Sequence, residues 1–122
     1  MKFLKNIALY WIKRAVIFEI NQEGDRFQEL LRSRIAKEGP GSVDRTIDAA
    51  QLRLLMVVET SGPKWSFLVP LRAKIKKAVQ RFGDDLQVKI NAGVRDHGPA
   101  AVDRVFDTAQ AALIKSVEAI RL

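Results

Sequence analysis

The 122-residue sequence contains no cysteine, one histidine and one tyrosine. Without cysteine, the chain holds no disulfide scaffold, cysteine nucleophile, iron–sulfur cluster or cysteine-type zinc site. The single histidine, His97, stands beside Gly98 at an expected helix end, where a hydrogen-bond donor suits the last carbonyls. Glycine-rich phosphate loops, nucleophile elbows and paired-histidine metal motifs are also missing. These absences predict a protein that is not an enzyme and that uses no metal and no cofactor.

Long uncharged runs are missing as well. The longest are about seven residues, as in 6–12, far short of the roughly 18 that a membrane-spanning helix needs. The start of the chain is basic, but Lys13 and Arg14 interrupt its apolar stretch and no small-residue cleavage site follows. We therefore expect no signal peptide and no transmembrane segment, and a location in the cytoplasm or within an assembled particle.

The composition is that of one folded, basic domain. Hydrophobic residues make up 48% of the chain and charged residues 29%. The net charge is +7, from 21 Lys and Arg against 14 Asp and Glu. Between Thr60 and Gly83 there is no anion but there are six cations: Lys64, Arg72, Lys74, Lys76, Lys77 and Arg81. Such a cluster binds nucleic-acid phosphates, with Trp65 and Phe67 stacking on bases, or it is a solvated face beside two anchoring rings.

The sequence repeats itself with an offset of 59 residues. Positions 24–59 share 14 identities with positions 83–118 without a gap, whereas chance would give about two or three. Gly39-Pro40 corresponds to Gly98-Pro99, and Val43-Asp44-Arg45 corresponds to Val102-Asp103-Arg104. The sequence therefore predicts a tandem duplication, with repeat 1 at about 1–60, a linker at 61–67 and repeat 2 at about 68–122.

Each repeat has three segments with apolar residues at helical spacing and none with the alternation of a strand. Glycines follow the first two segments of each repeat, at positions 24, 39, 83 and 98, and we expect them to end helices. The predicted helices are 2–20, 25–38, 42–60, 68–82, 84–97 and 99–121. We therefore predict an all-α fold, a six-helix bundle built from two three-helix repeats with a pseudo-two-fold relation.

The first predicted helix differs from its counterpart in repeat 2. Both carry a core stripe, but the first helix has a second apolar stripe on the opposite face, made of Phe3, Leu4, Ile7, Trp11, Ala15 and Phe18. At roughly 1.5–3 kcal/mol for each large side chain, this stripe is too costly to leave in water. Three coverings are open: the rest of the domain, another subunit or protein partner, or a membrane surface with lysines and Arg14 facing the head groups.

Charged residues near the start of the third helix recur in both repeats: Asp44, Arg45, Asp48, Asp103, Arg104 and Asp107. Four carboxylates raise the question of a metal site, but carboxylate metal sites in bundles use Glu and Glu-x-x-His ligands, which this pattern lacks. We interpret these residues as structural, pairing within a helix or forming reciprocal salt bridges between the repeats.

The function that follows is non-catalytic. We expect a self-associating structural or adaptor protein of a larger assembly, which joins a second copy or a protein partner through the second stripe of the first helix. A component of a virus or phage particle fits a small, basic, cysteine-free chain. The alternative is a nucleic-acid-binding protein that uses the basic surface of residues 64–81. The third hypothesis is peripheral membrane binding through the N-terminal amphipathic helix.

Overall fold

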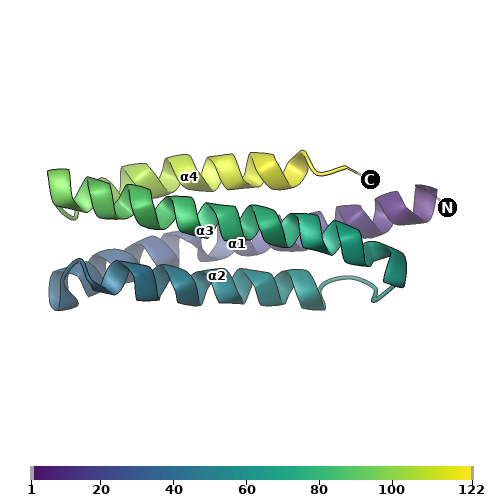
Figure 1. Cartoon of the computed structure of the whole chain (residues 1–122), viewed down its shortest axis with the longest axis horizontal. Helices are drawn as coiled ribbons and strands as arrows, with labels where there is room; N and C mark the ends of the chain where they lie inside the picture. Colours follow the sequence, from purple (N-terminus) through teal and green to yellow (C-terminus); the bar gives the residue numbers. More distant parts are fainter. Residues whose placement is uncertain (1, 122) are drawn as a thin grey trace.

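The computed structural model describes residues 2–121, and every regular element in that range is helical. The elements are α1 (Lys2–Glu38), α2 (Ser42–Thr60), the short 3-10 helix η1 (Ser66–Leu68), α3 (Val69–His97) and α4 (Ala101–Glu118). Figure 1 shows the four long helices as antiparallel rods, with both hairpin turns at one end and the two termini and the α2–α3 linker at the other. The predicted all-α class is confirmed.

The predicted number of helices is wrong, because the described part of the chain forms four α-helices instead of six. The predicted helices 2–20 and 25–38 are one continuous helix, α1, and the predicted helices 68–82 and 84–97 are continuous in α3. Gly24 and Gly83 lie inside these helices and end neither of them. A single glycine costs a helix only about 1 kcal/mol, and no proline follows either one to stop the next turn.

The two glycines in question allow neighbouring helices to approach closely. A Cβ atom at Gly24 would lie 2.7 Å from Oε1 of Gln110 on α4, and a Cβ atom at Gly83 would lie 2.6 Å from Oε1 of Gln51 on α2. Because real Cβ atoms hardly ever come this near a heavy atom, each glycine provides room for a glutamine of the other hairpin. The glycine signal in the sequence therefore reflects packing between helices at these two positions.

The other two glycines do end helices, as predicted. Gly39 follows α1 with φ +85° and Gly98 follows α3 with φ +76°, a conformation that other residues rarely adopt. Their amides donate to the carbonyls of Ile35 and Val94, at 2.9 and 2.8 Å. In both turns the next residue is proline, so the chain leaves the helix at once and begins the antiparallel partner.

Each long helix packs against two neighbours: α1 and α3 both contact α2 and α4. The core side chains fall into two clusters along the bundle. The cluster near the termini contains Ala8, Leu9, Ile12, Val16, Ile20, Val58, Leu68, Leu71, Ile75, Leu113 and Val117. The cluster near the hairpin turns contains Leu31, Ile35, Val43, Ile47, Leu86, Ile90, Val94, Val102 and Phe106. Phe82 packs against both clusters and connects them at the middle of the bundle.

Candidate self-association surface

The second apolar stripe of α1 faces away from the bundle. Phe3, Trp11 and Phe18 are 73%, 58% and 64% exposed, and Leu4 is also exposed, whereas Ile7 and Ala15 are half-buried. Helices α2 and α4 flank the buried face of α1, and none of the described elements lies over the opposite face. The first of the three coverings is therefore excluded, because the protein's own helices do not shield the stripe.

One aromatic residue of this surface was not in the predicted stripe. Tyr10 is 57% exposed, and the Arg14 guanidinium carbon lies 5.8 Å from the centre of its ring, within cation–π range. Tyr10 follows Phe3 by seven residues, so it extends the edge of the stripe along the helix. The seven-residue spacing was the signal that would have found it. From here on, the α1 stripe means Phe3, Leu4, Ile7, Tyr10, Trp11, Ala15 and Phe18.

The α1 stripe is larger than the scattered apolar residues of an ordinary surface. A large aromatic side chain has roughly 150–250 Å² of surface area. The four exposed rings of the α1 stripe and Leu4 therefore present on the order of 500–600 Å² of apolar surface. That area is at the upper end of the largest apolar patch on a typical monomer, and patches of this size usually mark an interaction site. Two such surfaces in contact would bury about 1,000–1,200 Å² in total, the lower limit for a specific pair.

The six cations of the predicted basic surface do not form one continuous exposed patch in the structure. Arg72 is buried, and its guanidinium donates to the carbonyls of Val58 and of Pro63, the latter at 2.6 Å. Lys76 forms an ion pair with Glu59, and the Lys74 ammonium donates to a carbonyl near the C-terminus, at Arg121.

Of the six cations in this predicted surface, Lys64, Lys77 and Arg81 are exposed and make no hydrogen bond or ion pair with the described residues. The rings of Trp65 and Phe67 pack in a tilted arrangement with their centres 5.4 Å apart, and the ring centre of Phe67 lies 5.4 Å from the ammonium of Lys5 on α1. The two rings thus connect the linker to the N-terminal part of α1, although both remain partly exposed.

The repeated aspartates lie between the hairpins, but their partners differ from those predicted. Asp48 accepts a hydrogen bond from Gln87 at 2.6 Å, and Asp107 accepts one from Gln28 at 2.7 Å. The two bonds are equivalent: each joins a glutamine of one repeat to an aspartate of the other, and the offset of 59 relates Gln28 to Gln87 and Asp48 to Asp107.

The second pair of aspartates follows the same scheme with different donors. Asp44 accepts from Asn91 at 2.9 Å, whereas Asp103 pairs with Arg32 in an ion pair between the hairpins. Arg45 pairs with Glu38 of its own repeat, and the backbone carbonyl of Arg104 accepts from Thr108 while its side chain is exposed. Among the described residues, none of the six predicted residues forms a salt bridge with another of the six, because α2 and α4 pack on α1 and α3 rather than on each other. The Asp–Arg ion pair between the repeats uses Arg32 of α1 instead.

A cation closes the C-terminal end of each shorter helix. Lys13 of α1 donates to the carbonyl of Glu118 at the end of α4, at 3.0 Å, just as Arg72 of α3 donates to Val58 near the end of α2. A positive charge at a helix C-terminus interacts favourably with its free carbonyls. Burial lowers the pKa of Lys13, and nearby Arg121 lowers it further while Glu118 opposes the shift. Burial also lowers the pKa of Arg72.

Other classes of site receive no support from the geometry. Within residues 2–121, no three histidine, aspartate or glutamate side chains come together in a way that would hold a metal ion. None of the described helices combines the length and the apolar character needed to cross a bilayer. Comparison with known protein families, with curated proteins and with solved structures finds no match.

Proposed function

We propose that this protein is a non-catalytic, self-associating helical unit that joins a second copy through the α1 stripe. The observation that carries the proposal is the exposure of Phe3, Trp11 and Phe18 on one face of a helix whose other face is fully packed. Leu4, Trp11 and Phe18 follow one another at seven-residue intervals. This spacing keeps them on one seam of a helix pair, so two copies of α1 can pack along it.

A second copy accounts for the α1 stripe better than a membrane does. Binding to anionic lipid requires cations on the same side as the apolar face or at its borders. Lys13 donates to Glu118 and Lys5 lies against Phe67, so two of the cations expected to face head groups have intramolecular contacts. The side chain of Lys2 lies outside the described residues. Arg14 remains beside Tyr10 at the border of the stripe.

We also propose that the chain is a duplicated helical hairpin, α1–α2 and α3–α4, related by a pseudo-two-fold axis. The support is the exchange of equivalent contacts between the hairpins. Gly24 with Gln110 corresponds to Gly83 with Gln51, and the cations at positions 13 and 72 occupy corresponding places at two helix ends. A dimer of identical hairpins has such paired contacts. The α1 stripe then marks where the two halves differ.

The test is molar mass by light scattering across protein concentration, at low and at high salt. We expect the wild type to be a dimer or larger oligomer and the variants Trp11→Glu and Phe18→Glu to be folded monomers. Val88→Glu is the matched control, because Val88 is an exposed apolar residue on α3, outside the stripe. High salt should preserve the oligomer, since apolar burial rather than charge holds it together.

Two results would overturn this assignment. One is a wild type that stays monomeric at high concentration. The other is a mass that falls as much in Val88→Glu as in Trp11→Glu. The nucleic-acid alternative predicts instead that Lys77→Glu and Arg81→Glu abolish binding to single-stranded DNA, with an affinity that falls steeply with salt. Sedimentation with anionic liposomes tests the membrane alternative directly.

A further inference from the structure

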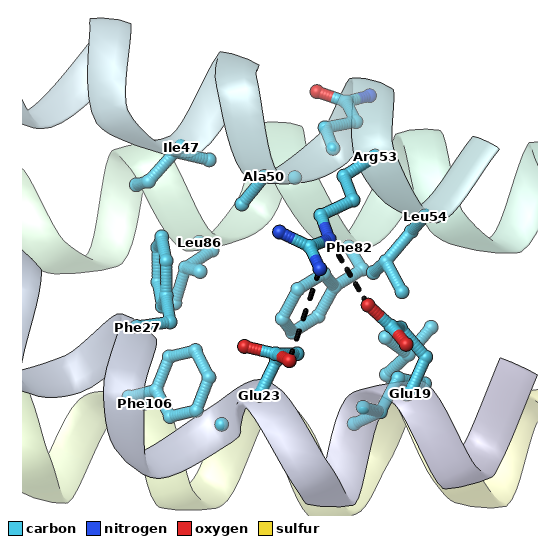
Figure 2. Close-up of a pocket in the computed structure, with 15 residues that line it drawn as sticks. Glu19, Glu23, Phe27, Ile47, Ala50, Arg53, Leu54, Phe82, Leu86 and Phe106 are labelled. Carbon is cyan, nitrogen blue, oxygen red and sulfur yellow. Dashed lines mark hydrogen bonds and ion pairs between the residues drawn. The ribbon is translucent and has the colours of Figure 1, made fainter. Parts of the chain in front are cut away.

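A cavity of about 80 Å³ lies at the middle of the bundle, between the two core clusters. Its wall includes Phe27, Phe82 and Phe106, with Ile47, Ala50 and Leu54 of α2 above them (Figure 2). The ring centres of Phe27 and Phe106 are 5.1 Å apart, and Phe82 meets Phe106 edge-on at 6.5 Å. The cavity is thus bordered by three interacting rings and by aliphatic side chains.

Charged side chains form the mouth of this cavity between α1 and α2. Figure 2 shows Arg53 of α2 reaching across to Glu19 and Glu23 of α1, with Nε 3.1 Å from Glu19 Oε1 and Nη2 3.8 Å from Glu23 Oε1. Arg26 lies 3.4 Å from the other carboxylate oxygen of Glu23. Two guanidiniums and two carboxylates cancel, so the mouth has no net charge that would select an ionic ligand.

The opposite side of the bundle lacks this arrangement. The offset of 59 relates Glu19, Glu23 and Arg53 to Ala78, Phe82 and Ala112. The ring of Phe82 extends from the second hairpin to the centre of the bundle, where it packs against both core clusters. A second hollow, of about 180 Å³, lies at this corresponding place between α3 and α4, and its lining includes Arg81, Asp85 and Lys89. The two hollows therefore differ in chemistry, and the one between α1 and α2 has the aromatic and aliphatic wall.

We infer that this cavity binds one small, uncharged, apolar molecule, which enters between α1 and α2 when the Arg53 side chain moves aside. The apolar wall gives a water molecule few partners, whereas an apolar guest gains dispersion contacts with the rings and aliphatic side chains that line it. The volume is about half of the roughly 150 Å³ that holds benzene in an engineered apolar cavity, so the guest is smaller than benzene. Arg53 is largely exposed, and exposed ion pairs hold a side chain weakly.

The probes are xenon and cyclopropane, added to the full-length protein with ¹³C-labelled methyl groups. We expect saturable shifts of the Ile47 and Leu54 methyl signals and none of the Leu9 signal, which belongs to the terminal cluster. Ala50→Leu fills the cavity and should abolish the saturable shifts. Ala49→Leu is the matched control, because Ala49 is exposed on the same helix and should leave binding unchanged.

The outcomes are decisive in either direction. Saturable shifts in wild type and Ala49→Leu that vanish in Ala50→Leu establish the site. Absence of saturation in the wild type, or equal shifts in Ala50→Leu, overturns it. If Ala50→Leu fails to fold, Ala50→Val replaces it, with weakened binding as the expected result and unchanged binding as the contrary one. The experiment is independent of self-association, since Trp11→Glu, the variant expected to be monomeric, retains every residue of the cavity.

Discussion

Replacing Arg72 by methionine tests whether a buried cation holds the end of α2. Arg72 is 6% exposed, and its guanidinium donates to the carbonyls of Val58 and Pro63. Methionine keeps an unbranched apolar stem but removes both hydrogen bonds. Bonds from a charged donor contribute about 1.5–3 kcal/mol each. Relief from burying a charge offsets part of that loss, as the lowered pKa of Arg72 indicates. We expect the free energy of unfolding to fall by about 2–3 kcal/mol.

The matched comparison is Lys13→Met at the corresponding position of α1. Lys13 makes one exposed hydrogen bond, at 3.0 Å, to the carbonyl of Glu118. A cation near a helix end contributes about 0.3–1 kcal/mol, and partial burial of Lys13 opposes this gain, so this variant should lose at most about 1 kcal/mol. Arg72→Lys retains the charge and should be intermediate, because a single ammonium replaces the two-pronged guanidinium.

Urea unfolding followed by circular dichroism measures all three variants with the wild type. The midpoint should fall furthest in Arg72→Met, with an unchanged slope, because the surface exposed on unfolding is nearly the same. Each kcal/mol corresponds to roughly 3–5 °C in the melting temperature of a chain of this size. If Arg72→Met loses no more stability than Lys13→Met, the hydrogen bonds of Arg72 to the carbonyls of Val58 and Pro63 do not hold the end of α2.

Three further outcomes are expected, each measured by urea unfolding. Gly83→Ala alone should change stability by less than about 1 kcal/mol, because the gain in helix propensity opposes displacement of the Gln51 side chain. Adding Gln51→Ala should bring a net gain of about 0.5–1 kcal/mol, and a net loss in the double variant would contradict the close approach of Gly83 and Gln51. Burial keeps the pKa of Lys13 below the ordinary lysine value of about 10.4, so between these two values the unfolded chain binds more protons at Lys13 than the folded chain does. The stability of the wild type relative to Lys13→Met should therefore rise with pH over that interval. A fall over the interval would contradict a lowered pKa. Asp48→Ala and Asp107→Ala should cost similar amounts, about 0.5–1.5 kcal/mol each, because both lose an equivalent hydrogen bond.

Much of the secondary structure could be predicted from local sequence signals. The apolar stripes at helical spacing gave the helical class, and glycine followed by proline gave both hairpin turns. These signals work because the residues that cause the structure stand next to it in the chain: Gly39 takes its positive φ, and Pro40 cannot continue the helix.

Gly24 and Gly83 show where such local signals fail. A glycine that ends a helix and a glycine that admits a neighbour look alike in sequence, and the deciding partner, Gln110, is 86 positions beyond Gly24. The repeat did hold the missing information, because Gln51 and Gln110 are identical in the two halves along with the glycines. A pair of residues kept together in both copies of a duplication points to a contact between them.

The candidate surfaces were predictable to different degrees. The opposite placement of the two α1 stripes follows from helical periodicity alone, so the residues of the α1 stripe could be named without coordinates. The burial of Arg72 could not be predicted, because its place in a run of cations resembles that of its neighbours Lys74 and Lys76. Only the packing shows that position 72 faces the core side of α3 beside the end of α2.

The comparison between α1 and α3 bears on why the α1 stripe exists. Both helices hold equivalent places in the bundle, so the fold itself requires no apolar residues on the outer face of either one. On α3 that face carries Lys77 at the position that corresponds to Phe18. The exposed rings on the outer face of α1 therefore contribute little to packing within the chain, and they carry a cost in solubility. A requirement from outside the chain would explain why one of the two helices has them and the other does not, and the second copy proposed above is such a requirement.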